Sequence, residues 1–226
     1  MKRLDGRVAV VTGAGSGIGR ATSLALAERG CSIAVVDVQP DGAEETAEHV
    51  RSLGTRASVH LADVRDPARI DELPAEVEDS LGPCHILVNN AGVTAAGAFA
   101  DEAIGDLRWI VDINVWGVVH GCRAFLPMLR EADEAHIVNM SSMVGLLGLP
   151  HNVSYSLTKG AVRAFSEALR GELATTQVGV TVVFPGAIHT NSAPTTASRS
   201  NSMTSKASPK KHARSGERLR GRRDRC

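Results

Sequence analysis

Short, continuous runs of apolar residues recur along the first 190 residues of the chain. The first run, at residues 8–12, is rich in valine and ends at a cluster of glycines. Continuous apolar runs, as opposed to alternating ones, are typical of strands buried on both faces of a parallel sheet. The pattern predicts six such strands, at residues 8–12, 33–37, 57–60, 86–89, 137–140 and 180–184.

The segments between these runs have the periodicity of amphipathic helices. In residues 17–30, Ile18, Ala21 and Leu24 recur at helical spacing, and Gly30 is a typical helix stop. The same spacing predicts further helices at residues 41–53, 67–81, 101–130 and 154–175. Six strands joined by crossover helices predict an α/β fold, namely a Rossmann-type doubly wound parallel sheet with helices on both faces.

The charge of the chain is unevenly distributed, although 25 basic and 25 acidic residues balance overall. Residues 191–226 hold ten Lys or Arg and two acidic residues, which leaves 15 basic and 23 acidic residues before them. The two parts therefore carry +8 and −8. A basic, Ser/Thr-rich segment with few apolar residues cannot bury enough surface to fold. We expect one domain at residues 1–190 and a disordered basic tail at residues 191–226.

Membrane, secretory and metal-binding signals are missing from the sequence. It contains no run of about 18 uncharged apolar residues, and its N-terminus lacks the apolar core of a signal peptide. The four cysteines are far apart, and the eight histidines have no metal-binding spacing. We expect a cytoplasmic protein without a membrane span or a metal site, in which the reduced thiols are Cys31, Cys84, Cys122 and Cys226.

The candidate chemistry lies where the predicted strands end, as ligand sites do in doubly wound sheets. A glycine-rich segment at residues 12–19, here called the glycine turn, joins the first strand to the first helix. Such a turn lets a pyrophosphate approach the backbone, and the N–H groups of the helix end favour its charge. Asp37 ends the second strand, 18 residues after Gly19, where an acid can bind a ribose 2′-hydroxyl. A tight turn and a capping aspartate would explain the same residues without any ligand.

Further polar residues follow the later strands or lie in the predicted helices. Taken singly, each has an ordinary explanation, because Asn pairs form turns and a Tyr–Lys spacing of four occurs on solvated helix faces. Tyr155 is the only tyrosine of the chain. The residues in question are Asp63, Val64, Asn89, Asn90, Gly92, Asn114, Ser142, Tyr155 and Lys159.

Together, these residues resemble the short-chain dehydrogenase/reductase family in their order and spacing. The resemblance covers about residues 4–190. The matching pieces are Thr12-Gly13-x-x-x-Gly17-x-Gly19, Asp37, Asp63, Asn89-Asn90-Ala91-Gly92, Asn114, Ser142, Tyr155-x-x-x-Lys159 and Pro185-Gly186. The resemblance implies hydride transfer between a nicotinamide and an alcohol or carbonyl carbon, with catalytic residues Asn114, Ser142, Tyr155 and Lys159.

The resemblance also implies NAD as the cofactor and a set of residues that bind it. Ile188 and Thr190 would hold the nicotinamide carboxamide, and the Asn114 side chain would hold a water that relays protons from Lys159. Asp37 would repel a 2′-phosphate, which favours NAD over NADP. The expected cofactor-binding residues are Gly13, Ser16, Gly17, Ile18, Gly19, Asp37, Asp63, Val64, Asn90, Gly92, Tyr155, Lys159, Pro185, Gly186, Ile188 and Thr190.

Elementary electrostatics supports the roles of Tyr155 and Lys159 independently. Tyrosine titrates near 10 and is a poor base at pH 7. Lys159, four residues later, lies on the same helix face. An ammonium about 4 Å away is worth ~4 kcal/mol at an effective dielectric near 20, enough to lower the pKa of Tyr155 by about 3 units. Tyr155 then serves as general base for an alcohol or general acid for a ketone, while Ser142 orients the substrate oxygen.

The chain departs from the family pattern after Thr190. Family members usually continue with a helical lid over the substrate and a seventh strand, whereas the basic tail follows here. We therefore expect the fold to lack the usual C-terminal lid and last strand. The expected function is NAD(H)-dependent interconversion of a secondary alcohol and a ketone. Mostly apolar residues at 93–96 and 143–149 indicate a hydrophobic small-molecule substrate.

Two alternatives stay open at this point. A chain without a lid could be a nucleotide-binding protein with little or no turnover. The +8 tail could instead bind RNA or an acidic partner. Nucleic acid is the less expected partner, because the sequence lacks the interleaved aromatic and basic residues of an RNA platform.

The apolar surface of two predicted helices indicates a homodimer. Helices 101–130 and 154–175 carry more apolar positions than one core-facing stripe requires, and family members commonly pair these helices. The apolar residues are Leu107, Ile110, Val111, Val115, Val118, Val119, Val162, Phe165, Ala168 and Leu169.

Overall fold

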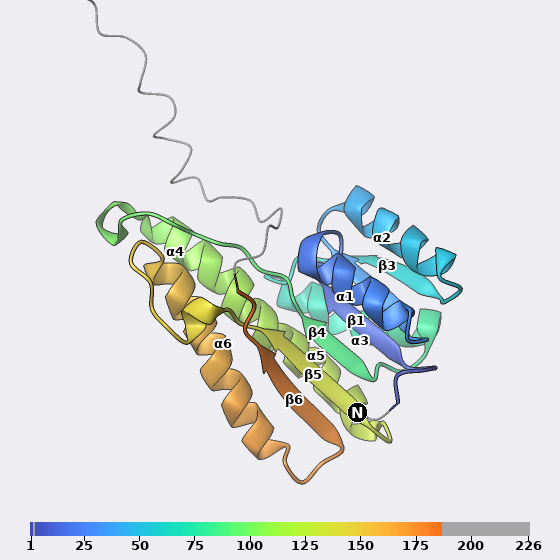
Figure 1. Cartoon of the computed structure of the whole chain (residues 1–226). Coiled ribbons are helices and arrows are strands. Elements are labelled where there is room, and N and C mark those ends of the chain that lie inside the picture. Colours follow the sequence, from blue (N-terminus) through green and yellow to red (C-terminus); the bar gives the residue numbers. More distant parts are fainter. Residues whose placement is uncertain (2, 187–226) are drawn as a thin grey trace, which may run out of the picture.

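A six-stranded parallel sheet forms the centre of the molecule (Figure 1). The computed structural model describes residue 1 and residues 3–186 of the chain. The strand order is β3-β2-β1-β4-β5-β6. The strands are β1 (Val8–Thr12), β2 (Ser32–Asp37), β3 (Ala57–Leu61), β4 (Ile86–Asn89), β5 (Ala135–Met140) and β6 (Val178–Val183). The predicted Rossmann-type sheet is confirmed, and each strand lies within two residues of its predicted position.

The strand order reverses between β1 and β4, and this reversal creates a crevice at the carboxyl ends of the strands. Val10 of β1 is paired with Ala34 of β2 on one side and with Leu87 of β4 on the other. All five residues of β1 are buried, as the continuous apolar run predicts for a central parallel strand. The ends of β1 and β4 therefore meet at the position where such sheets bind ligands.

Helices cover both faces of the sheet, each burying one apolar face. Ala27 and Ala43 of α1 and α2 belong to one core cluster, and Ile70, Val118 and Val162 of α3, α5 and α6 belong to the other. Figure 1 shows α6 beside the β6 edge. The helices are α1 (Gly17–Ala27), α2 (Pro40–Ser52), α3 (Pro67–Leu81), α4 (Ile104–Val111), α5 (Gly117–Glu131) and α6 (Val153–Glu172), with short 3-10 turns η1 (Phe99–Asp101) and η3 (Met143–Gly145).

The single helix predicted at residues 101–130 is wrong. A π-helical segment, η2 (Asp112–Trp116), separates α4 from α5, and the helical structure begins at Ile104 because Asp101 ends the η1 turn. The buried side chain of Asn114, in the middle of η2, donates to and accepts from the backbone of Val93. This contact joins residues 21 positions apart, so a local hydrophobic pattern does not reveal it. π-Helical bulges are frequent at functional sites.

Two further expectations concern membrane spans and the C-terminal tail. Within residues 1 and 3–186, no helix is long and apolar enough to cross a membrane. The predicted tail at residues 191–226, and with it the expected absence of a lid and a last strand, lies outside the described residues.

Candidate functional site

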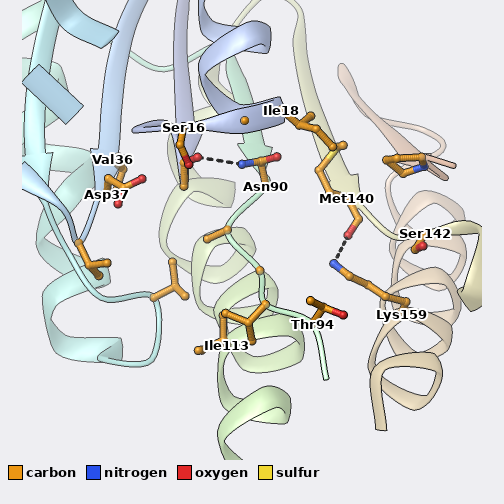
Figure 2. Close-up of a pocket in the computed structure, with 18 of the residues that line it drawn as sticks. Ser16, Ile18, Val36, Asp37, Asn90, Thr94, Ile113, Met140, Ser142 and Lys159 are labelled. Atoms are coloured by element: carbon orange, nitrogen blue, oxygen red, sulfur yellow. Dashed lines mark hydrogen bonds between the residues drawn. The ribbon is translucent and has the colours of Figure 1, made fainter. Parts of the chain in front are cut away.

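A cavity of about 530 Å³ opens at the carboxyl ends of the central strands. Figure 2 shows Asp37 at one end of it, and Ser142 and Lys159 at the other. Its lining includes Gly13, Ser16, Gly17, Ile18, Asp37, Asp63, Val64, Asn90, Gly92, Ser142, Tyr155, Lys159, Pro185 and Gly186. The fold thus brings these predicted residues, which span more than 170 positions of the sequence, into one site.

Two glycines of the glycine turn occupy positions at which a side chain would be sterically excluded. Gly13 has φ +63°, and a Cβ there would lie 2.8 Å from the Ala91 Cα. A Cβ on Gly19 would collide with the Gly13 carbonyl oxygen. Gly19 itself therefore lies behind the turn and does not line the cavity. The turn can pack this closely against the end of β4 because both positions are glycine.

Asn90 fastens the glycine turn to the end of β4. Its Nδ2 donates to the carbonyl oxygens of Thr12 and Gly13, at 2.9 and 3.1 Å. In return, the Thr12 hydroxyl accepts the backbone N–H groups of Asn90 and Ala91, both at 3.0 Å. The two strand ends are thus joined by side-chain hydrogen bonds as well as by the sheet ladder.

The N-terminus of α1 and the carboxylate of Asp37 offer complementary binding groups. Ser16 caps α1 without a side-chain hydrogen bond, and both Ser16 and Gly17 line the cavity. N–H groups at such a helix end attract anions. Asp37 accepts hydrogen bonds from the backbone of Gly15 at 2.8 Å and Gln39 at 2.9 Å, which hold its carboxylate in one orientation.

Arg65 is a cavity residue that the sequence analysis missed. Its guanidinium donates to both carboxylate oxygens of Asp63, with distances of 2.6 to 3.1 Å. This ion pair lowers the pKa of Asp63. The Asp63 carboxylate is therefore paired with an arginine in this structure. The neighbouring Trp109 and Ile113 also line the cavity and were missed. Arg65 follows Val64 and Ile113 precedes Asn114 in the sequence, and this position beside an expected site residue is the signal that could have pointed to them.

The opposite end of the cavity holds Ser142, Tyr155 and Lys159. The buried Lys159 Nζ donates to the Met140 carbonyl oxygen at 2.8 Å, as Figure 2 shows, and lies 5.9 Å from the centroid of the Tyr155 ring. Burial lowers the pKa of Lys159 to about 8. Burial also raises the pKa of Tyr155, against an opposing hydrogen-bond contribution from Ser142. The expectation that Lys159 lowers the pKa of Tyr155 is therefore wrong for the protein alone, because burial of Tyr155 raises this pKa and the Lys159 amine donates to the Met140 carbonyl.

Asn114 lies behind the cavity wall rather than in it. Its Oδ1 accepts the Val93 N–H at 2.8 Å, while its Nδ2 donates to the Val93 carbonyl at 2.9 Å and to the Thr158 hydroxyl at 3.1 Å. The expected role of this side chain as a water ligand stays a prediction. In this structure it joins η2 to the loop after β4 and to α6, the helix that carries Tyr155 and Lys159.

The remaining predicted positions are accounted for as follows. Ile188 and Thr190 lie outside the described residues. Among the residues that the structure describes, no group of three or more His, Cys, Asp or Glu is placed to hold a metal ion. Cys31, Cys84 and Cys122 are buried and free, and burial raises the pKa of each thiol to between about 11 and about 12.

Known proteins are similar to this chain in both sequence and fold. The short chain dehydrogenase family profile matches residues 7–201. The SadH protein of Mycobacterium tuberculosis is 40% identical over 192 residues, which are 84% of this chain and 70% of SadH. An NAD complex of a short chain dehydrogenase/reductase from Burkholderia phymatum superposes with a TM-score of 0.83 and 34% identity, covering 93% of this chain and 76% of that one.

A second solved structure is similar over the same region. NAD⁺-bound xylitol dehydrogenase superposes with a TM-score of 0.79 and 33% identity, covering 82% of this chain and 72% of that one. The profile match extends over most of this chain, and it begins one residue before β1. The chain belongs to the short-chain dehydrogenase/reductase family.

Proposed function

We propose that this protein is an NAD(H)-dependent oxidoreductase that interconverts a hydrophobic secondary alcohol and a ketone. The observation that carries the proposal is the shared cavity, in which the glycine turn and Asp37 lie at one end and Ser142, Tyr155 and Lys159 at the other. One end has the features of a dinucleotide site, and the other has the features of a proton-transfer site.

The cavity fits the cofactor by size and by its binding groups. A volume of about 530 Å³ lies within the roughly 300–1,000 Å³ that is usual for cofactor sites. The close approach of the Gly13 backbone to Ala91 packs the turn against the end of β4, and Ser16 and Gly17 line the cavity at the helix end where a diphosphate would lie. The fixed Asp37 carboxylate would accept hydrogen bonds from ribose hydroxyls and would repel a 2′-phosphate. These features support NAD over NADP.

When bound, NAD supplies the acceptor or donor of the hydride. The residues of this chain handle the proton. The Ser142 hydroxyl would hold the substrate oxygen, and the Tyr155 hydroxyl would give a proton to a ketone or take one from an alcohol. Lys159, with a pKa of about 8, can hold or release a proton near neutral pH. It would therefore resupply or remove the proton that Tyr155 gives or takes.

Large exposed apolar side chains near Ser142 support a hydrophobic substrate. Met143, Leu146, Leu147 and Leu149 follow Ser142 directly and are 41 to 64% exposed. Phe99, in the loop after β4, is 59% exposed. Large apolar side chains exposed on the segment after Ser142 are available to cover an apolar substrate. The substrate would place its carbinol or carbonyl group at Ser142 and its apolar part along these residues.

We propose a homodimer through α4, α5 and α6. Ile110, Val118 and Val162 are buried in the core, whereas Leu107 and Val119 are only partly buried, so part of the apolar surface faces outward. A dimer would bury it. Light scattering at micromolar concentration should give twice the chain mass, and a monomeric mass would refute the pairing.

The buried free cysteines support a cytoplasmic location.

Turnover of purified protein tests the proposed function. NAD with a panel of secondary alcohols, and NADH with the matching ketones, should show nicotinamide absorbance changes with at least one apolar substrate. NADH binding without turnover on any pair would favour the alternative, a nucleotide-binding protein without activity. Absence of both binding and turnover would contradict the proposal.

A further inference from the structure

Arg20 of α1 points back toward the glycine turn and forms a hydrogen-bonded cluster with α2. Its Nη2 donates to the Gly15 carbonyl at 2.5 Å and to the Glu45 carboxylate at 2.7 Å, with the Gly42 carbonyl farther away at 3.4 Å. Its Nε donates to the Thr46 hydroxyl at 3.0 Å. We call Arg20, Glu45 and Thr46 the α2 anchor.

Thr46 is the buried centre of the α2 anchor. Its side chain is fully buried, and its hydroxyl lies 2.9 Å from the Ala14 carbonyl and 3.0 Å from the Gly42 carbonyl. The α2 anchor therefore engages two consecutive carbonyl groups of the glycine turn, those of Ala14 and Gly15. Neither Arg20 nor Thr46 lines the cavity.

Holding a carbonyl also fixes the N–H group of the same peptide. The trans peptide is planar, so its C=O and the following N–H point in opposite directions. When Thr46 holds the Ala14 carbonyl, the Gly15 N–H points away from α2, and it donates to Asp37 at 2.8 Å. When Arg20 holds the Gly15 carbonyl, the Ser16 N–H points away from Arg20, at a residue that lines the cavity.

Helix stability does not account for an arginine at this position. Arg20 lies in the first turn of α1, where the helix dipole disfavours a cation, and this turn contains no acidic residue. The compensating carboxylate comes from Glu45 on α2 instead, and Arg20 lowers the pKa of Glu45. The contacts of Arg20 thus point to the turn and not to its own helix.

We infer that Arg20 and Thr46 are positioning residues for the dinucleotide, because they orient the peptides that present the Gly15 and Ser16 N–H groups. The inference rests on the proposed NAD(H) function. Arg20 acts through the Gly15–Ser16 peptide, at the helix end that would hold the diphosphate common to NADH and NADPH. Thr46 acts through the Ala14–Gly15 peptide, and hence through Asp37, the residue that distinguishes the two cofactors.

The variants Arg20→Met and Thr46→Val separate these effects. Arg20→Met should raise the Kd of both NADH and NADPH about tenfold, the size of one hydrogen bond to a charged group, and leave kcat at saturating cofactor unchanged. Thr46→Val should raise the Kd of NADH more than that of NADPH. Arg20→Lys should lie between wild type and Arg20→Met, because a lysine donates without the planar fork.

Amide exchange in the cofactor-free protein supplies a readout that does not depend on activity. In Thr46→Val, the Gly15 amide should exchange faster than in wild type, because its hydrogen bond to Asp37 loosens. The control is Arg51→Met, which removes the exposed Arg51–Glu44 ion pair from the same helix α2. It should leave the Kd of NADH and the Gly15 exchange rate unchanged.

A simple charge effect predicts a different pattern. If the cation of Arg20 merely attracted the diphosphate, Glu45→Gln would tighten NADH binding as much as Arg20→Met weakens it. That result would overturn the inference, as would unchanged NADH binding and unchanged amide exchange in both Arg20→Met and Thr46→Val. If Arg20→Met does not fold, Thr46→Val and Arg20→Lys decide the question. Failure of the wild type to bind NADH would overturn the proposed function instead.

Discussion

Around the glycine turn, side chains from α1, α2 and the residue after β4 each hold backbone carbonyl groups, whereas the loops on the substrate side are held mainly near their ends. Asn90, Thr46 and Arg20 engage the carbonyls of residues 12–15. On the other side, residues 93–103 and 143–152 contact each other through the Gly97 N–H and the His151 carbonyl, at 2.9 Å. These two segments, here called the substrate-side loops, also present five large exposed apolar residues.

The contrast indicates that the fold sets the backbone conformation on the cofactor side, whereas the conformation of the substrate-side loops can vary. A dinucleotide is recognised through backbone N–H groups whose directions must be set within narrow limits, so the surrounding contacts are dense. A hydrophobic substrate is recognised by apolar area, which tolerates variation in loop conformation. The cofactor side should therefore be sensitive to small substitutions, and the substrate-side loops should not.

Removing the Tyr155 hydroxyl should stop the chemistry and leave the cofactor side intact. Tyr155→Phe should lower kcat by about 10²–10⁴-fold, the usual contribution of a general acid/base, because it deletes the oxygen that transfers the proton. The Kd of NADH should stay within a few-fold of wild type. Steady-state kinetics and NADH titration measure both. Retention of more than about a hundredth of wild-type activity would exclude Tyr155 as the acid/base.

The addition of one methyl group should affect stability and NADH binding on the cofactor side of the cavity but not on the substrate side. In Gly19→Ala, the new Cβ collides with the Gly13 carbonyl. The free energy of unfolding should fall by about 1–3 kcal/mol, as for other overpacked sites, and NADH binding should weaken because the turn moves. The matched control is Gly148→Ala in a substrate-side loop, where an added Cβ meets nothing within 4 Å. Equal behaviour of the two variants in urea denaturation and NADH titration would refute the contrast.

Asp37 should set the cofactor preference. Asp37→Ala removes the carboxylate that repels a 2′-phosphate and accepts ribose hydroxyls. NADH binding should weaken about tenfold, and NADPH binding should strengthen relative to it. Parallel titrations of the variant with both cofactors measure the change. An unchanged ratio of the two Kd values would show that the preference arises elsewhere.

The buried amine of Lys159 should leave a smaller signature in the pH dependence of stability. Its pKa is about 8 in the folded protein and near 10.5 when exposed. Between these values the unfolded chain binds more protons, so the free energy of unfolding rises with pH. Relative to Lys159→Met, the wild type should gain about 1 kcal/mol between pH 8 and pH 9 in urea denaturation. Parallel pH profiles for the two proteins would contradict this assignment.

The sequence predicted the sheet and most of the cavity because these features follow from local patterns. Buried strands are continuous apolar runs, and the turns after them carry the glycine and polar residues of the site. The π-helical segment at Asn114 could not be predicted in this way, because it is held by contacts to Val93 and Thr158, which are 21 and 44 positions away.

The contacts that charged side chains make could not be predicted from the sequence either. The ion pair between Asp63 and Arg65 depends on side-chain conformation rather than on residue type. The same holds for Lys159, whose amine donates to the Met140 carbonyl. Spacing placed Lys159 on the correct helix face, but the position of its amine depends on the carbonyl at the end of β5.

Titration of the wild-type protein with NADH and NADPH tests the central claim most directly, because it examines the cofactor side without requiring a known substrate. The structure predicts that NADH binds with a Kd on the order of 1 to 100 μM and at least about tenfold more tightly than NADPH, because Asp37 lies fixed at the end of the cavity. Equal or tighter binding of NADPH, or no binding of NADH at millimolar concentration, would contradict the account.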